Sequence, residues 1–152
     1  MTLETLVPQA HVIADLRVAD KPKLLQELAR RAGAALHLPP GDIAAALSAR
    51  EALGSTGVGA GIAVPHARLP QLDRTAGFLV RLGRPVDYAS VDGRMVDLVF
   101  LLLGPPAARN EHLAALAAAT RRLRDPAIAE ALRTAANAEV LRSRFLAEPP
   151  SK

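Results

Sequence analysis

The chain has 152 residues and a mass of 16.0 kDa, which suits one domain with a single core and is too short for two complete enzymatic domains. Its hydrophobic fraction is 50% with only 3% aromatic residues and no cysteine. This composition excludes disulfides, thiolate zinc sites and thiol nucleophiles, and it removes the aromatic platforms of single-stranded nucleic-acid binders. The formal net charge is +4, but the basic residues are spread from Arg17 to Arg144, so we expect no nucleic-acid partner.

The sequence shows no targeting or membrane signal. Its first ten residues, MTLETLVPQA, have neither a basic start nor a sustained apolar segment, unlike a signal peptide. The longest strongly apolar stretch, residues 98–103, is far shorter than the roughly 20 residues that cross a bilayer. We therefore expect a cytoplasmic protein without direct membrane insertion.

The first third of the chain is predicted to form a strand and two helices. Residues 11–18, HVIADLRV, alternate loosely and are rich in β-branched residues, which is typical of a strand. Asp20 is a good N-cap for a helix that should end at the Pro-Pro pair before the next segment. A second helix is predicted over residues 42–53, with Arg50 in its last turn and Gly54 in a left-handed position just beyond it.

Three strand candidates follow, and the last of them indicates the architecture. They cover residues 62–64, 77–82 and 95–103. The segment from Val96 to Leu103 is apolar at nearly every position, as expected for a central strand covered by helices on both faces. A three-layer α/β fold is therefore predicted. A single domain should occupy residues 1–147, followed by a disordered tail at 148–152.

The last third of the chain is predicted to be helical. Helices over residues 110–123, 126–134 and 137–146 should each be opened by Asn or Asp, which are good N-cap residues. The arginines near the end of the first of these helices complement its dipole.

The chemical centre is predicted to lie in the run from Arg50 to Arg68, REALGSTGVGAGIAVPHAR. Its glycines allow successive backbone amides to point into one concave site, which suits an anion. It matches neither a P-loop nor a dinucleotide-binding loop, so ATP and NAD are not expected as ligands. Pro65 should end the preceding strand and leave His66 exposed at the sheet's edge. An exposed, neutral imidazole is a competent nucleophile.

Several residues could serve a phosphoryl group on His66. The candidate phosphate donors are Arg50, Ser55, Thr56 and the amides of Gly57 and Gly59. A second histidine, His112, lies near the start of a predicted helix, and we expect it to meet His66 in space. Each of these residues also has a purely structural reading: Arg50 as a helix-end cation, the two hydroxyl residues as loop caps, and His112 as a structural histidine. His11 and His37 are read as surface residues.

These residues resemble the IIA components of the phosphoenolpyruvate-dependent phosphotransferase system, in its fructose, mannitol and nitrogen-regulatory branch. The family's signature is close to REALGSTG followed by GIAIPH, and here Ala60 stands where Asn is usual and Val64 where Ile is usual. The later segments VDLVFLLLGP and EHLAALAAATRRL also match, so the resemblance covers nearly the whole chain.

The resemblance implies a fold and a site. The fold would be a mixed sheet between helices. His66 would accept a phosphoryl group from a phosphohistidine on an HPr-like carrier, with no metal and no bound cofactor. His112 would pair with His66, and Arg50 would be the active-site arginine.

The branch within the family leaves three alternatives open. A free-standing chain resembles the nitrogen-regulatory type, in which phosphorylation controls docking to targets such as kinases or transporters in nitrogen, potassium or carbon processes. A sugar-specific IIA would instead pass the phosphoryl group to a separate IIB subunit. A non-catalytic regulatory binding module is the third reading. A serine hydrolase built on Ser55, His66 and Asp73 is disfavoured because the chain has no GxSxG motif.

Overall fold

The computed structural model describes residues 2–147, which contain one six-stranded mixed sheet. Its strands are β1 (Val12–Leu16), β2 (Gly57–Gly59), β3 (Ile62–Ala63), β4 (His66–Arg68), β5 (Ala76–Val86) and β6 (Val96–Gly104). The main path runs β1-β5-β6-β3-β2, and β4 also pairs with β6. Strand β6 is antiparallel to β5 and parallel to β3 and β4, so it lies at the centre of the sheet.

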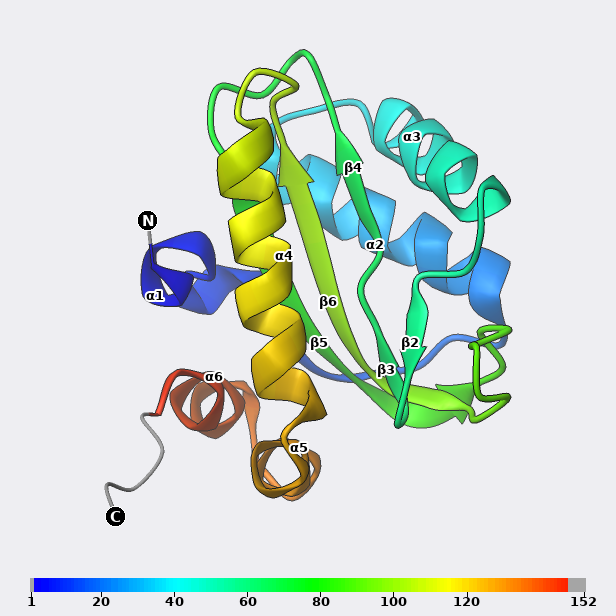
Figure 1. Cartoon of the computed structure of the whole chain (residues 1–152), viewed down its shortest axis with the longest axis vertical. Coiled ribbons are helices and arrows are strands. Elements are labelled where there is room, and N and C mark those ends of the chain that lie inside the picture. Colours follow the sequence, from blue (N-terminus) through cyan, green and yellow to red (C-terminus); the bar gives the residue numbers. More distant parts are fainter. Residues whose placement is uncertain (1, 148–152) are drawn as a thin grey trace.

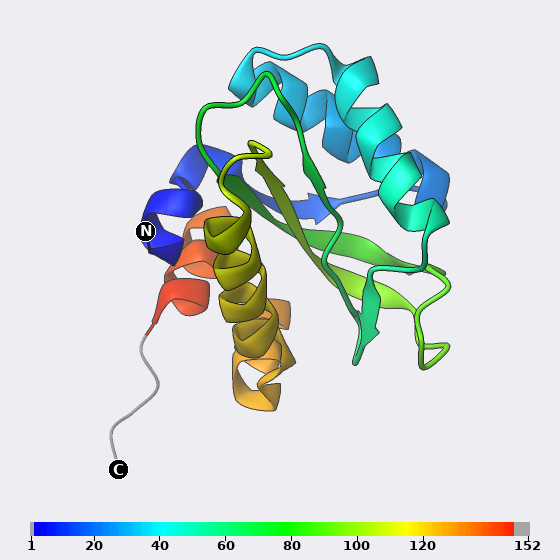
Figure 2. The same cartoon turned by 45° about the horizontal axis from the view of Figure 1, so that its top comes forward.

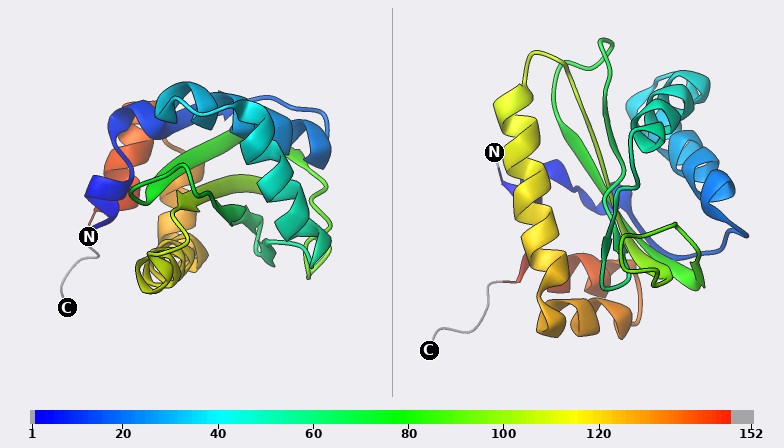
Figure 3. Two further views of the ribbon diagram at one scale, coloured as in Figure 1. Left: turned by 90° about the horizontal axis from the view of Figure 1, so that it is seen from above. Right: turned by 45° about the vertical axis from the view of Figure 1, so that its right-hand side comes forward.

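Helices cover both faces of this sheet (Figure 1). They are α1 (Leu3–Leu6), α2 (Lys21–Leu36), α3 (Pro40–Ala52), α4 (Arg109–Arg124), α5 (Pro126–Arg133) and α6 (Ala138–Leu146), with a 3-10 turn at Gln9–His11. In the right-hand view of Figure 3, α4 lies on one side of the sheet and α2 with α3 on the other. The predicted three-layer α/β fold with a mixed sheet is confirmed.

Strand β6 divides the interior into two hydrophobic cores. Val99, Leu101 and Leu103 face the core beneath α2 and α3, whereas Phe100 and Leu102 face the core beneath α4 and the C-terminal helices. This alternation follows from the two-residue period of a strand. A strand with both faces buried must be apolar throughout, which explains the run that marked it in the sequence.

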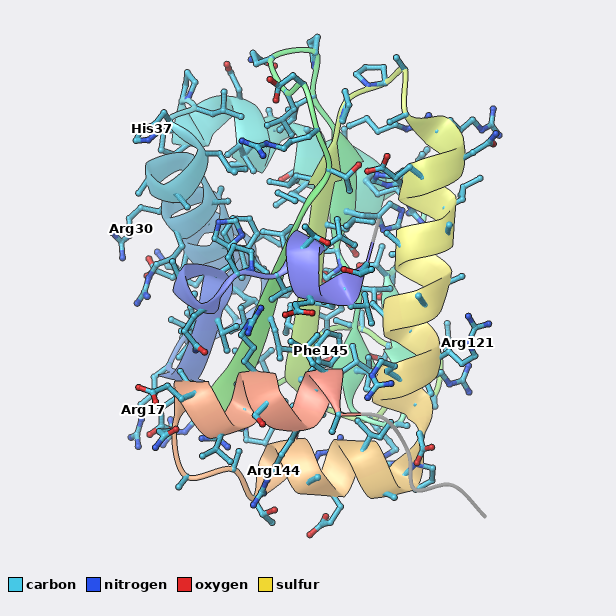
Figure 4. The ribbon with its side chains drawn as sticks, turned by 90° about the vertical axis from the view of Figure 1, so that its left-hand side faces the viewer. Arg17, Arg30, His37, Arg121, Arg144 and Phe145 are labelled. Carbon is cyan, nitrogen blue, oxygen red and sulfur yellow. The ribbon has the colours of Figure 1, made fainter. Side chains whose placement is uncertain are left out.

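The C-terminal helices close the second core. Phe145 points from α6 toward the sheet (Figure 4) and stacks on Phe100 with 5.9 Å between ring centroids. In the same figure Arg17, Arg30 and Arg121 lie on separate parts of the molecule. No helix within residues 2–147 is both long and apolar enough to cross a membrane.

Three helix caps follow the expected chemistry and one does not. The side chains of Asp20, Asp125 and Asn137 accept backbone N–H groups at the starts of α2, α5 and α6. The prediction that Asn110 opens its helix is wrong, because α4 begins at Arg109 after Ala108, which makes no side-chain cap.

Some elements were missed or misplaced by the sequence-based expectation. Helix α1, strand β2 and strand β4 were not predicted, and α3 begins at Pro40 instead of residue 42. Proline is tolerated in the first turn of a helix, where its missing N–H costs nothing, so the Pro-Pro pair starts this helix. The domain limit at residue 147 stays a prediction, and the expected tail at 148–152 lies outside the described residues.

Candidate functional site

Three elements bring the candidate residues to one end of the sheet. Strand β4 runs between α3 and α4, as Figures 1 and 2 show from two directions. His66 is the first residue of β4 and pairs with Leu102 of the central strand. Arg50 comes from the last turn of α3, and His112 comes from the first turn of α4. The structure therefore brings Arg50, His66 and His112 together.

His66 occupies a different place from the exposed strand end that the sequence suggested. Pro65 lies between β3 and β4, both of which pair with β6, and its carbonyl accepts the Leu102 amide of that strand. The ladder then resumes at His66, which is half-buried. Because Pro lacks only the N–H, it can lie at a break in a strand without ending the sheet. The imidazole is thus held by a strand instead of projecting freely from an edge.

The hydrogen bonds of His66 fix its tautomer. Its Nδ1 lies 2.8 Å from the carbonyl oxygen of Val64, which can only accept, so Nδ1 carries the proton. Its Nε2 accepts a hydrogen bond from the Nε–H of Arg50 at 3.2 Å. The Nε2 lone pair therefore points toward Arg50.

Burial and positive neighbours keep the His66 ring neutral. Desolvation is the largest effect that lowers the pKa of His66, and the charges of Arg50 and Arg68 lower it further. The Val64 carbonyl and Glu51 act in the opposite direction but do not reverse the shift. At neutral pH the unprotonated Nε2 is available as a nucleophile.

Arg50 is held by its own helix end. Its Nη1 donates to the carbonyl oxygen of Gly54 at 3.0 Å, just past the C-terminus of α3. Gly54 has φ +148°, so the glycine at this turn adopts a conformation that L side chains rarely take. The turn that ends α3 thereby also aims the guanidinium at His66.

His112 forms the opposite wall of the site. Its ring centroid lies 5.7 Å from that of His66, with 57° between the ring planes. The residue is only 3% exposed, and burial together with the nearby His66 and Arg68 lowers the pKa of His112 to about 4. Its backbone amide donates to the carbonyl oxygen of Ala108 and is therefore not free for an anion.

An open cleft of about 550 Å³ joins these residues to solvent. Besides Arg50, His66 and His112 it is lined by Ala46, Ala49, Leu53, Ala67, Arg68, Leu113 and Leu116. Two of the apolar residues at its edge, Leu53 and Leu113, are 84% and 51% exposed. The cleft thus combines two cations, Arg50 and Arg68, with an apolar rim formed by Leu53 and Leu113.

The other predicted phosphate donors do not line this cleft. Ser55 donates its hydroxyl to the Tyr88 carbonyl and accepts the Gly57 amide. Thr56 is buried, and both its amide and its hydroxyl donate to the Glu51 carboxylate. Gly57 and Gly59 lie in strand β2 and pair with β3. A phosphate contact by these residues stays a prediction, and it would require these bonds to break.

Sequence reasoning missed the residue that organises this segment, which is Glu51. Its carboxylate binds Lys21 at 2.9 Å, the amide and hydroxyl of Thr56, and the hydroxyl of Tyr88. Burial would raise the pKa of Glu51, but the hydrogen bonds from Thr56 and Lys21 outweigh it and the pKa is lowered. The sequence did contain a signal for this role. Glu51 directly follows Arg50 in the last turn of a helix, where the helix dipole disfavours an acidic residue.

The remaining histidines lie elsewhere. His37 is exposed at the end of α2, as expected. His11 is not a simple surface residue, because its ring stacks on Phe78 at 4.0 Å and its Nδ1 lies 3.0 Å from the Gly77 carbonyl. Within residues 2–147, no group of three or more histidine and carboxylate side chains is arranged to hold a metal ion.

Comparison with known proteins gives consistent matches. Residues 5–147 match the family described as "Phosphoenolpyruvate-dependent sugar phosphotransferase system, EIIA 2". A "Nitrogen regulatory protein" of Bradyrhizobium diazoefficiens is 43% identical over 151 residues, covering 99% of this chain and 98% of that protein.

Two solved structures extend the comparison to the fold. The nitrogen regulatory protein IIA-Ntr of Neisseria meningitidis superposes with a TM-score of 0.89 at 34% identity, covering 94% of this chain and 98% of that one. IIA mannitol of Escherichia coli gives a TM-score of 0.75 at 20% identity over 91% of this chain and 97% of that one, a likeness of fold alone.

Proposed function

Because this chain belongs to the phosphoenolpyruvate-dependent sugar phosphotransferase system EIIA 2 family, we propose that His66 accepts a phosphoryl group from a phosphohistidine on an HPr-like carrier protein. The observation that carries this proposal is the state of the His66 ring. Its proton is held on Nδ1 by the Val64 carbonyl, and its Nε2 lone pair faces the Arg50 guanidinium in an open cleft.

The transfer needs no proton movement at His66. The Nε2 lone pair forms the new N–P bond while the P–N bond to the carrier's histidine breaks and its electron pair returns to that ring. Nδ1 keeps its proton and its bond to Val64 throughout. The neutral form required for attack is the form that burial and Arg50 favour.

Arg50 changes partner during this reaction. Its Nε–H must leave Nε2 as the N–P bond forms, and the guanidinium can then donate to phosphoryl oxygens. Arg68 adds positive charge at the same cleft, and the neutral ring of His112 supports the phosphoryl group without acting as the nucleophile. Ser55, Thr56, Gly57 and Gly59 take a supporting part by holding the segment between Arg50 and His66.

The biological role follows the nitrogen-regulatory relatives. Phosphorylation adds a charge of about −1.5 to −2 at a cleft that holds Arg50 and Arg68, and it thereby changes which proteins dock over the cleft. Regulatory targets such as kinases or transporters in nitrogen, potassium or carbon metabolism are the proposed readers of this state. A cytoplasmic location is part of the same proposal.

A sugar-specific role is the second candidate, because the matching family is described as a sugar phosphotransferase component. In that role the phosphoryl group on His66 would pass on to a IIB subunit. Transfer from the phosphorylated protein to a purified fructose- or mannitol-type IIB domain would favour this alternative over the regulatory role.

The proposal is tested by intact-mass spectrometry after incubation with phosphoenolpyruvate, enzyme I and an HPr-type carrier. Sugar-type and nitrogen-type carriers are compared in parallel with wild type, His66→Ala and, as matched control, the exposed His37→Asn. We expect one acid-labile phosphoryl group on wild type and on the control, and none on His66→Ala. Retained labelling of His66→Ala would refute the acceptor role, and unlabelled wild type with both carriers would favour a non-catalytic binding module.

A further inference from the structure

Two buried polar atoms beside the site have no hydrogen-bond partner within residues 2–147. They are the hydroxyl oxygen of Thr75 and the Nδ1 of His112. Thr75 is 7% exposed and His112 is 3% exposed, so water at the surface cannot satisfy them. An unpaired buried polar group is destabilising, so two such atoms near one site call for a hydrogen-bond partner.

Both atoms lie against Gly104. Strands β5 and β6 are antiparallel, and Ala76 pairs with Leu103. Thr75, one residue before Ala76, therefore lies opposite Gly104, one residue after Leu103, at the end of the sheet. A methyl group added at Gly104 would lie 3.1 Å from the Thr75 hydroxyl and 3.3 Å from His112 Nδ1. Both atoms therefore border the same small space, which exists because residue 104 has no side chain.

The strand period puts this space on the same face of the sheet as His66. In β5, Leu79 faces the core beneath α4, and in β6 Leu102 does the same. Thr75 and Gly104 lie an even number of residues from these positions, so they share that face. His112 of α4 lies against Gly104.

We propose that the Thr75 hydroxyl donates a hydrogen bond to His112 Nδ1, directly or through one buried water, and so acts as a positioning residue for His112. With Nδ1 as acceptor, the ring's proton lies on Nε2. Resting on the proposed function, this assigns the Nε2–H of His112 as a donor to the phosphoryl group on His66. The two histidines then have opposite tautomers, one offering a lone pair to phosphorus and the other a proton donor to oxygen.

A neutral ring is essential to this arrangement, since a doubly protonated His112 could accept nothing at Nδ1. The ring is neutral because it is buried next to His66 and Arg68. A threonine hydroxyl can act as donor or acceptor, but only its donor role leaves Nε2 protonated.

The tautomers are read from long-range ¹H–¹⁵N spectra of the unphosphorylated, ¹⁵N-labelled protein at pH 7. We expect an unprotonated Nδ1 and a protonated Nε2 for His112, and the reverse for His66. Thr75→Val keeps the shape and removes the hydroxyl, so it should mix the His112 tautomers and slow phosphoryl transfer about 3- to 10-fold. Thr75→Ser keeps the hydroxyl and should restore both the spectrum and most of the rate.

Two results would overturn the inference. One is a His112 protonated on Nδ1 in the wild-type protein. The other is a Thr75→Val variant with unchanged His112 signals. Because the spectra need no carrier, these results are independent of phosphorylation. A wild-type protein that shows the expected tautomers but accepts no phosphoryl group from either carrier would instead overturn the proposed function and still support the hydrogen bond. If Thr75→Val fails to fold, Gly104→Ala, whose methyl group crowds both atoms, should mix the His112 tautomers in the same way, and unchanged His112 signals in that variant would overturn the inference.

Discussion

At the scale of single residues, the geometry of the site depends on which partner each nitrogen of His66 and Arg50 binds. His66 uses Nδ1 for a backbone carbonyl and keeps Nε2 for Arg50. Arg50 in turn uses Nη1 for the Gly54 carbonyl and Nε for His66. The remaining guanidinium N–H groups are free to meet phosphoryl oxygens, which fits an arginine better than a lysine.

Removal of the guanidinium should slow the acceptor reaction without preventing folding. We expect Arg50→Ala to reduce the rate of phosphoryl transfer about 10- to 100-fold, because a hydrogen bond to a charged group contributes about 1.5–3 kcal/mol. Arg50→Lys should recover only part of that rate, since an ammonium lacks the planar fork. Rapid-quench kinetics with a phosphorylated carrier measure both, and a rate within twofold of wild type for Arg50→Ala would remove this residue from the mechanism.

The buried His112 should make stability depend on acidity. In the unfolded chain the pKa of His112 is about 6.5. In the folded protein burial, His66 and Arg68 lower this pKa to about 4. Between these values unfolding takes up a proton, so the free energy of unfolding should fall as the pH is lowered from about 6.5 to about 4. Urea titrations across this range should show a shallower pH dependence for His112→Gln than for wild type. Parallel curves would contradict the neutral buried ring.

The proximity of the three candidate site residues could be predicted from the sequence better than their surroundings could. The motif was enough to predict that Arg50, His66 and His112 come together. It could not show that the hydroxyls of Ser55 and Thr56 are bonded to Tyr88, because Tyr88 is more than thirty positions away in the chain. Hydrogen-bonding capacity is visible in a sequence, but the partner that uses it is decided by tertiary contacts.

At the scale of elements, Glu51 joins pieces that are separate in the chain. Its carboxylate connects the end of α3 to Lys21 at the start of α2, to Thr56 before β2 and to Tyr88 after β5. The side chain is only 7% exposed, and the hydroxyls of Thr56 and Tyr88 that it binds also lie 3.0 Å from each other. The network holds the turn from which Arg50 reaches His66.

Loss of this carboxylate should therefore destabilise the protein and loosen the site. We expect Glu51→Ala to lower the free energy of unfolding by about 3 kcal/mol, because it leaves buried donors and a partly buried lysine unpaired. Glu27→Ala, which removes a carboxylate paired with Arg30 and Arg31 on the surface of α2, is the matched control and should have a much smaller effect. Chemical denaturation compares them, and equal losses would contradict the network's role.

The elements also show why strand boundaries were harder to predict than the fold. The apolar run of β6 identified the central strand, and Asp20, Asp125 and Asn137 marked three helix starts. Strand β4 was missed because Pro65 looks like a strand end when neighbours are unknown. Its pairing with β6 is supplied by a strand over thirty residues later, which no local pattern reveals.

At the scale of the whole molecule, the cleft presents a cationic centre inside an apolar rim. Leu53 from the end of α3 and Leu113 from α4 lie on either side of His66 and are among the most exposed large hydrophobic residues of the described chain. A protein that delivers a phosphoryl group to Nε2 must pass over this rim. Exposed apolar residues around a buried polar centre are typical of protein docking sites.

Polar substitutions at the apolar rim should weaken the docking of the carrier more than they slow the phosphoryl-transfer step. We expect Leu53→Ser combined with Leu113→Ser to raise the KM for the phosphorylated carrier about tenfold while kcat changes little. Val91→Ser is the matched control, because Val91 is 79% exposed but does not line the cleft. Steady-state transfer assays separate the two parameters, and an unchanged KM in the double variant would place the docking surface elsewhere.

In the phosphorylated protein the phosphoryl group should be bonded to Nε2 of His66, and the attachment atom can be observed directly. The measurement is a long-range ¹H–¹⁵N spectrum of the ¹⁵N-labelled protein before and after phosphorylation, with a ³¹P spectrum of the same sample. We predict that phosphorylation shifts the Nε2 signal of His66 while Nδ1 stays protonated and bonded to Val64. A phosphorus bond at Nδ1, or on any other residue, would contradict the account.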